Sequence, residues 1–312
     1  SGSLIISGTG FEGFFHVVEP TGLPYTVVVD SLIGPFDSVR AGDEIGIFDG
    51  STPVGVVVYG QQDKISDGPS FSLSFDGQND YVNLGDVGDT HPVSYELWFK
   101  PKNNISGSLS QDMYLIGKDG SGIYTFRIVL ETSGRLGFGV GGSGSSGNWI
   151  RTTNSTWLST KWYHVVGTIS TTEMNLYVNG IHQGSLTTYD GIQQNGYNTY
   201  VGTHVYANQS WFEGYIDDIR IWNRSLTFAE VVDLRARIVD GTENGLIGYW
   251  NLNSGTVPTA SDITGNGYDG TIYGATFSVE TPVVLFMSSG SLSGIAWQAD
   301  TDKGQVGFTP GN

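Results

Sequence analysis

Along most of the chain, apolar and polar residues alternate in short runs separated by glycine, asparagine and aspartate. Examples are YELWFK at 95–100, YTFRIVLE at 124–131 and YIDDIRIW at 215–222. Alternation with a period of two places one face of a strand in a core and the other face outside it. Because many consecutive segments share this pattern, the sequence predicts an all-β protein built as a sandwich.

One segment has helical spacing instead. Across residues 225–237 (SLTFAEVVDLRAR), apolar residues recur every three to four positions. Thr227 and Glu230 match a capping box, in which each side chain accepts a free amide of the first turn. Arg235 and Arg237 follow at the carboxyl end, where the helix dipole favours positive charge. The pattern predicts one short surface helix.

A tight turn is expected at Asn179-Gly180, in the hairpin region formed by residues 162–169 and 174–184. Asparagine and glycine tolerate the positive φ angles that such a turn requires. Alternating aromatic residues in strands usually pack inward. The following side chains are therefore expected in the core: Trp162, Val165, Leu176, Val178, Trp98 and Trp222.

The composition and the strand pattern of the chain change twice along its length. The two ends consist of simple strand-and-turn runs, whereas the middle is richer in aromatic strands, and QQDKISDGPS at 61–70 has the composition of a linker. A length of 312 residues suits two domains. We therefore expect a smaller split domain, residues 1–67 plus 281–312, interrupted by a second domain at residues 68–280.

Four stretches of the middle region carry a family resemblance. They are FSLSFDGQNDYVNLG (71–85), WLSTKWYHVVGTISTTEMNLYVNGIHQG (157–184), WFEGYIDDIRIWNRSLTFAEV (211–231), and GLIGYWNLNSG with DITGNGYDGTIYGATF (245–277). In this order they resemble the laminin-G-like, concanavalin A-like jelly-roll domains of bacterial surface proteins. The resemblance implies a concanavalin A-like jelly-roll sandwich inserted into the second, smaller β-sandwich domain.

The outer region has a resemblance of its own. HVVEPTGLPYTVVVD (16–30), VRAGDEIGIFDGSTPVGVVVYG (39–60) and IAWQADTDKGQVGFTPGN (295–312) resemble a small β-sandwich repeat of secreted, type IX secretion-associated bacterial proteins. This resemblance implies a secreted or cell-surface location and neighbouring domains in a larger parent protein. It also implies a further strand after Asn312.

Charge excludes some partners. The formal net charge is −17, with 14 basic and 31 acidic residues and no basic cluster. Phosphate backbones attract clustered Lys and Arg, so nucleic-acid binding is not expected.

No apolar run approaches the roughly 20 residues that cross a bilayer, so no membrane insertion is expected. There is no cysteine, which excludes thiolate catalysis and cysteine zinc sites.

The expected cofactor is Ca²⁺, and this expectation comes from the jelly-roll resemblance. In that family and in related β-glucanases, an aspartate in a YxDxxRx motif binds calcium. YIDDIR at 215–220 matches this motif, so the resemblance implies that Asp217 is a calcium ligand. Asp76 of the FDG motif, with Asn79 or Asp80 in the following turn, is expected on the adjacent strand. Calcium takes six to eight oxygen ligands, so backbone carbonyls and water would complete the site.

The alternative is that Asp76 and Asp80 only shape a turn and that Asp218 faces solvent. A second acidic loop contains Asp262 and Asp269 in DITGNGYDG. It lacks the ligand series and the bidentate glutamate of an EF-hand. We expect a turn held by side-chain to backbone hydrogen bonds.

Catalysis has little support in the sequence. Glycoside hydrolysis needs two carboxylates about 5–10 Å apart, and no two of the ten glutamates lie within five residues of each other. There is no HExxH pair, no GxSxG elbow and no P-loop. The chain is therefore expected not to be an enzyme. A polysaccharide hydrolase with a carboxylate pair assembled from distant residues stays open as an alternative.

Jelly rolls of this kind often bind glycans through loop aromatics. The expected function is a non-catalytic extracellular carbohydrate-binding or adhesion module with a glycan or cell-surface or matrix ligand. The first alternative is a structural or protein-interaction spacer, since an exposed ring can simply cap the edge of a sandwich. The candidate ligand residues fall into two groups: Trp149, Arg151 and Asn154 after the glycine loop, and Tyr206, Asn208 and Trp211 in YANQSW.

Overall fold

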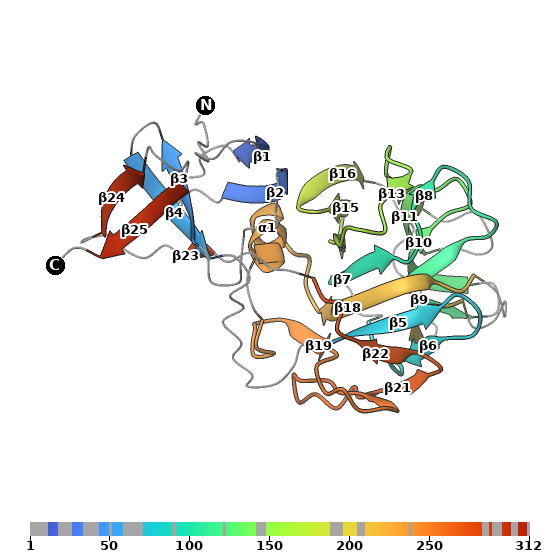
Figure 1. Ribbon diagram of the computed structural model, residues 1–312. Coiled ribbons are helices and arrows are strands. Elements are labelled where there is room, and N and C mark those ends of the chain that lie inside the picture. The colour runs from blue at the N-terminus through green and yellow to red at the C-terminus, as the bar shows by residue number, and fades with distance from the viewer. Residues whose placement is uncertain are drawn as a thin grey trace. The chain divides into compact units, whose positions relative to one another are not determined.

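The chain divides into two compact units, Ser1–Lys64 with Val283–Asn312 and Ile65–Pro282. Figure 1 shows the computed structural model as a ribbon. It describes seven strands of the first unit, at the level of the backbone. In the second unit it describes residues 71–282 except for these segments: 89–91, 121–122, 142–147, 188–195, 205–209 and 237–238.

In the first unit all described pairings are antiparallel. Strand β1 pairs with β2, β4 lies between β3 and β23, and β24 pairs with β25. The predicted insertion of one domain into a smaller sandwich, and the resemblance of that sandwich to a secreted repeat, stay predictions. The strands are β1 (Glu12–Val17), β2 (Val27–Ile33), β3 (Glu44–Asp49), β4 (Thr52–Val58), β23 (Met287–Ser288), β24 (Ile295–Asp300) and β25 (Gln305–Pro310).

The second unit contains two large antiparallel sheets. Sheet I has the strand order β12 (Asn148–Arg151), β11 (Leu136–Val140), β10 (Ile123–Leu130), β9 (Met113–Gly120), β17 (Thr199–Val201), β6 (Tyr81–Asn83), β21 (Gly270–Tyr273) and β20 (Thr259–Ala260).

Sheet II has the order β16 (Ile181–Leu186), β15 (Met174–Val178), β14 (Tyr163–Ile169), β7 (Val93–Pro101), β18 (Glu213–Trp222), β5 (Ser72–Asp76) and β22 (Thr276–Ser278), with β19 (Leu246–Trp250) also paired to β18. A short pair, β8 (Ile105–Ser106) and β13 (Thr156–Trp157), completes the strands of this unit.

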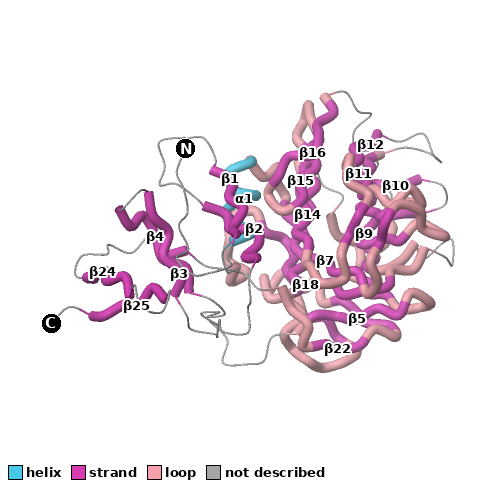
Figure 2. Tube along the Cα trace, turned by 45° about the horizontal axis from the view of Figure 1, so that its top comes forward, coloured by secondary structure: helices cyan, strands magenta, loops and turns pink. Residues whose placement is uncertain are grey.

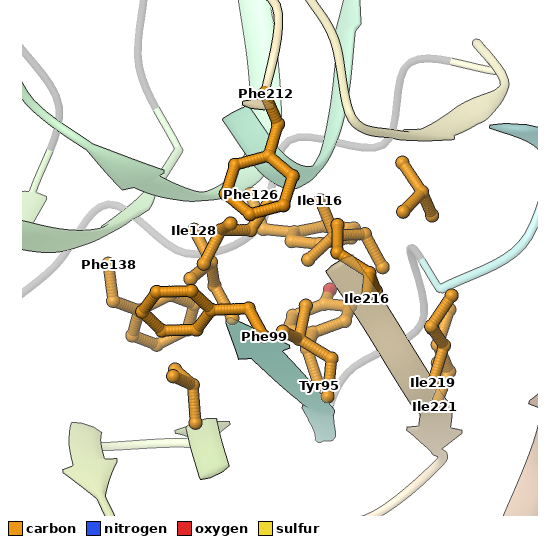
Figure 3. Packing of buried hydrophobic residues seen from close by; sticks show 14 of the residues in the cluster. Tyr95, Phe99, Ile116, Phe126, Ile128, Phe138, Phe212, Ile216, Ile219 and Ile221 are labelled. Atoms are coloured by element: carbon orange, nitrogen blue, oxygen red, sulfur yellow. The ribbon is translucent and has the colours of Figure 1, made fainter. Parts of the chain in front are cut away.

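The core lies between the two sheets. Figure 3 shows Tyr95 and Phe99 of β7 meeting Phe126 of β10 and Phe138 of β11. The rings of Tyr95 and Phe126 are stacked, with centroids 3.5 Å apart. Burial of this apolar surface is the main force that holds the sheets together. The prediction of an all-β jelly-roll sandwich is confirmed.

Three of the six side chains predicted for the core lie between the two sheets. The predicted inward residues Val165, Leu176 and Val178 belong to the core. Trp162 does not: it is half-buried, and its ring lies 6.4 Å from that of Tyr215. The prediction for Trp162 is wrong because Trp162 lies three positions before the inward Val165, so alternation gives the inward position to Tyr163 instead.

Two other predicted core tryptophans are buried outside this central cluster. Trp98 alternates with the core residues Leu97 and Phe99, so it lies on the other face of sheet II, where its ring is 5.0 Å from that of His164. Trp222 belongs to a second apolar cluster. Both tryptophans are buried, but on the outer face of sheet II.

The second cluster lies beneath α1 (Phe228–Ala236), the short predicted helix, shown in cyan in Figure 2. The Thr227 amide donates to Glu230 Oε2 at 2.8 Å, and the Glu230 amide donates to Thr227 Oγ1 at 3.3 Å, which confirms the capping box. The cluster consists of Val166, Tyr177, Trp222, Leu226, Val231, Leu234, Val239, Leu246 and Tyr249.

Among the described residues, no helix is long and apolar enough to cross a membrane.

A buried polar network lies on this same face of sheet II. Glu96 Oε1 accepts from Arg220 Nη1 at 2.6 Å and lies 2.9 Å from His164 Nε2, while its Oε2 accepts from Trp222 Nε1 at 3.0 Å. Burial alone would raise the pKa of Glu96, but Arg220, His164 and Trp222 together lower it to about 2. Glu96 is therefore ionised and fully engaged inside the protein.

Candidate functional site

A β-bulge decides which side chains of β10 reach the outer face of sheet I. The register between β10 and β9 shifts between Tyr124 and Phe126, so Thr125 is an extra residue. Phe126 points into the core, and the bulge turns Tyr124 to the same outer face as Arg127. The Arg127 guanidinium lies 3.7 Å from the centroid of the Tyr124 ring.

Around these residues lies a contiguous group that we call the Asp119 cluster. Asp119 Oδ1 accepts from Arg127 Nε at 3.0 Å, and Asp119 Oδ2 lies 3.3 Å from His204 Nε2. The His204 ring stacks on Tyr114 with centroids 4.9 Å apart. The group combines strands β9 and β10 with the bridge residue after β17, and its members are Tyr114, Asp119, Tyr124, Arg127 and His204.

Burial sets the charges of the Asp119 cluster. It raises the pKa of Asp119 to about 6, although Arg127 acts in the opposite direction. It lowers the pKa of His204, an effect that Arg127 reinforces, so the imidazole is neutral at pH 7. At this pH the cluster therefore holds one carboxylate against one guanidinium, and the carboxylate is close to its titration range.

A second group, which we call the Trp149 shelf, lies beside this cluster. It consists of Trp149 and Arg151 on β12 and of Gly139 and Gly137 opposite them on β11. Trp149 and Arg151 lie opposite Gly139 and Gly137, on the outer face of the sheet. A Cβ atom at Gly139 would come within 2.8 Å of the Trp149 ring, so the ring lies directly on the glycine backbone. Arg151 Nε donates to both carboxylate oxygens of Glu131, at 2.9 and 2.8 Å. Trp149 is half-buried, which leaves part of its ring open.

A second aromatic group lies further across the same sheet, and we call it the Tyr81 cluster: Tyr81, Tyr200, Trp211 and Tyr273. Tyr81 of β6 stacks on Tyr273 of β21, with centroids 4.5 Å apart and planes 13° apart. The rings of Tyr200 and Trp211 lie 6.1 and 6.2 Å from that of Tyr81. Tyr273 is 43% exposed and the other three are half-buried, so this cluster presents ring surface outward.

The structure therefore brings three of the predicted ligand residues, Trp149, Arg151 and Trp211, to one face of one sheet. Trp211 is more exposed than Phe212, as the sequence predicts. Asn154 forms a turn instead, because its side chain bonds both the amide and the carbonyl of Thr156. The other two predicted ligand residues, Tyr206 and Asn208, lie outside the described residues. A ligand role for each of them stays a prediction.

Sequence reasoning missed most of this face. The tyrosines of the Tyr81 cluster had a signal: Tyr81, Tyr200 and Tyr273 each adjoin an aliphatic core residue in a short strand, so alternation turns them outward. The Asp119 cluster had no signal in the sequence, because a bulge breaks the alternation around Tyr124 and because His204 is distant from Asp119 in sequence.

The predicted calcium residues lie in two separate places. In the turn after β5, Asp76 Oδ1 accepts the amides of Gln78 and Asn79, and Asp80 Oδ2 accepts the Asp76 amide. Burial raises the pKa of Asp80, because the charged form loses solvation. These carboxylates shape the turn, as the alternative interpretation expected.

Asp217 is not beside that turn. The register of β18 against β5 pairs Glu213 with Asp76, which places Asp217 four positions along the strand, about 13 Å at ~3.3 Å per residue. Asp217 is buried and accepts the Asp218 amide at 2.8 Å. Burial and the Asp218 charge raise the pKa of Asp217 well above its usual value.

The described part of the chain contains no group of three or more His, Cys, Asp or Glu side chains that could hold a metal ion. A calcium ion at Asp217 would therefore need carbonyl and water oxygens beside one carboxylate. Asp218 does not face solvent, since it accepts the Tyr249 hydroxyl at 2.5 Å. In the acidic loop, Asp262 accepts the amides of Thr264 and Tyr249, which confirms a turn held by hydrogen bonds.

Comparison with known families supplies the classification. A laminin-G family model of the concanavalin A-like lectin/glucanases superfamily matches residues 76–232. The chain belongs to this superfamily. The matched range of the superfamily model includes the whole Asp119 cluster, Trp149 and Trp211, whereas Tyr273 lies beyond it.

Solved structures also resemble this superfamily member. A candidate carbohydrate-binding protein from Bacteroides ovatus superposes with a TM-score of 0.53 at 17% identity, covering 92% of each chain. Domain 4 of an extracellular arabinanase from Geobacillus stearothermophilus, in complex with arabinotriose, has a TM-score of 0.43 at 21% identity and covers 59% of this chain and 83% of that one. A search of curated proteins finds no match.

Proposed function

We propose that residues 65–282 form a non-catalytic glycan-binding module whose ligand lies against the outer face of sheet I. One observation carries this proposal: the half-buried Trp149 and the Tyr81 cluster lie on that face, on either side of a buried group that combines a carboxylate, a guanidinium and a neutral imidazole. A sugar ring has an apolar face that packs on an aromatic ring, and hydroxyls that need polar partners. Binding sites of this kind combine apolar walls with a few fixed polar groups.

The comparisons support the same class of ligand. The superfamily is named for lectins and glucanases, and the similar protein from Bacteroides ovatus is a candidate carbohydrate-binding protein. Sugar-binding modules of this type work outside the cell, so we also propose that the protein is secreted or displayed on a bacterial surface.

The test is a glycan array followed by calorimetry on the full chain and its variants. Trp149→Ala and Trp211→Ala should each weaken binding of the best array ligand at least tenfold, because each removes a ring from the proposed face. Trp162→Ala is the matched control, since Trp162 is also half-buried but lies next to Tyr215 on sheet II. An array that stays silent across diverse polysaccharides would refute the proposal and favour the structural spacer.

Hydrolysis is a second candidate because of one observation: Asp119 has a pKa of about 6, a value that suits a general acid. Glu131, a second carboxylate near this face, has both oxygens bonded by Arg151, so it offers no free carboxylate to complete a catalytic pair with Asp119. We therefore propose binding without turnover. Release of reducing sugar by the wild type, abolished in Asp119→Asn, would replace binding by catalysis.

For calcium we propose a structural ion at Asp217. A buried carboxylate with a raised pKa destabilises the fold when ionised, and a cation would reverse that effect. If calcium binds there, chelation should lower the melting temperature by several degrees, and Asp217→Asn should do the same and remove the response to chelator. If no ion binds, Asp217→Asn should leave stability unchanged or raise it, with or without chelator. Asp269→Asn, in the acidic loop, is the control.

A further inference from the structure

The Trp149 shelf and the Tyr81 cluster lie on one face but far apart. Sheet I runs β12, β11, β10, β9, β17, β6, β21, so six strand intervals separate Trp149 from Tyr273. At ~4.8 Å per interval this is about 29 Å. The Asp119 cluster, on β9 and β10 and after β17, lies between the two.

The ring contacts connect one side of this face. Trp149 lies 5.9 Å from Tyr124, and the Arg127 guanidinium lies over Tyr124 and 5.8 Å from Tyr114. On the other side, Tyr200 of the Tyr81 cluster pairs with Gly117 of β9, the strand that carries Asp119. A Cβ atom at Gly117 would come within 3.4 Å of the Tyr114 ring, so Tyr114 of the Asp119 cluster lies over this glycine. The partly exposed rings of Trp149 and of the Tyr81 cluster therefore lie on either side of a largely buried Asp119 cluster, in one line across the strands.

The charges on this face are matched in pairs. Arg127 is paired with Asp119, and Arg151 is paired with Glu131 through two contacts. His204 is held neutral by burial beside Arg127. The pairs leave little attraction for an anionic ligand, and the formal net charge of −17 repels one at long range.

We infer that the ligand is an uncharged glycan chain that runs across the strands and contacts both the Trp149 shelf and the Tyr81 cluster. This inference rests on the proposed glycan-binding function and adds its ligand class, an extended neutral polysaccharide. Tyr81, Tyr200 and Tyr273 thereby become a second binding subsite. A single sugar reaches one cluster, whereas a longer chain reaches both, and the second contact is then intramolecular.

The experiment has two arms. In the first, calorimetry compares arabinan, xyloglucan and galactomannan with polygalacturonate and carrageenan as charged probes. In the second, oligosaccharides of increasing length from the best neutral probe are titrated into the wild type, Trp149→Ala and Tyr273→Ala. Phe228→Ala is the matched control, because Phe228 is 41% exposed, close to the 43% of Tyr273, but lies on α1.

Binding should grow at least tenfold with chain length before it levels off. Trp149→Ala and Tyr273→Ala should each remove at least a tenfold share of the affinity for the long chain, and Phe228→Ala should remove none. Charged probes should bind at least tenfold more weakly than the best neutral one. Affinity that is already maximal for a disaccharide, a Tyr273→Ala variant that binds like wild type, or preference for a charged probe would each overturn the inference but leave glycan binding intact. If no glycan binds at all, the proposed function fails as well.

Discussion

The outer faces of the two sheets each carry a buried carboxylate, and the two carboxylates differ in what surrounds them. On sheet II, Glu96 is bonded by Arg220, His164 and Trp222 close to the apolar cluster under α1, and its pKa is about 2. On sheet I, Asp119 has a pKa of about 6 and lies beside the buried rings of Tyr114 and Tyr124 and the half-buried ring of His204.

The difference separates a carboxylate whose hydrogen bonds are all made within the protein from one that is only partly bonded. A carboxylate whose hydrogen-bonding capacity is filled by donors of the same protein contributes to the fold and has nothing left to offer. A carboxylate held near its titration range gains from any additional donor that arrives. Among the described residues, Asp119 Oδ2 accepts no hydrogen bond within the protein, whereas both oxygens of Glu96 do.

The largest expected effect is at Glu96. Glu96→Gln keeps the shape of the side chain but removes the closer of the two carboxylates that pair with the buried Arg220 and leaves only Asp218, 3.3 Å away, which should cost about 3–5 kcal/mol of unfolding free energy. Urea denaturation of the full chain measures this. Glu173→Gln, in the turn between β14 and β15, should change the free energy of unfolding by less than ~0.5 kcal/mol. A cost below about 1 kcal/mol for Glu96→Gln would show that the network is not structural.

A pH series distinguishes the two carboxylates by sign. The folded pKa of Asp119 is raised from 3.8 to about 6, so its ionised form is the less stable one, and the wild type loses stability as pH rises through this window. Asn cannot ionise. Asp119→Asn should therefore gain on the wild type between pH 4 and pH 7, by up to about 3 kcal/mol for two pKa units.

Glu96 should behave in the opposite way. Its folded pKa is lowered from 4.5 to about 2, so its stabilisation is complete above pH 4.5 and is lost as pH falls toward 2. The deficit of Glu96→Gln should therefore shrink in acid. Melting temperatures at half-unit pH steps provide both curves, and parallel curves for the two variants would contradict the contrast between the faces.

The smallest expected effect is at the helix that covers part of sheet II. Thr227→Ala removes the cap of α1, which should cost about 1 kcal/mol. Hydrogen exchange of the α1 amides should become faster, while glycan affinity should stay the same because α1 packs on the other sheet. A loss of glycan affinity in Thr227→Ala would show that the two faces are coupled.

Features of the fold could be predicted from the sequence where they depend on residues that are close together along the chain. Alternation predicted the sandwich and placed Val165 and Leu176 in its core, and the spacing of Thr227 and Glu230 predicted the cap of α1. These features depend on residues at most a few positions apart. Trp162 was misplaced because it lies an odd number of positions from Val165, so the two side chains cannot share a face of β14.

The candidate site was accessible only in part. Trp149 and Trp211 were selected as aromatic residues near loops, but nothing in the sequence shows that they share a face. That face depends on the pairing order of sheet I, in which β17 lies between β9 and β6 although the three strands are distant in sequence. The pairing of Asp119 with His204 depends on the same order, and local patterns do not encode it.

The extra residue in β10 makes the outer face of sheet I depend on one register shift. If Thr125 paired regularly with Asp119, Tyr124 would move opposite Gly120 and turn inward, toward a core that has no room for it. Arg127 would then lose the ring beneath it, although every contacting residue would still be present in the sequence. Relatives that lack Thr125 altogether would keep Tyr124 outward, because it would then directly precede the inward Phe126.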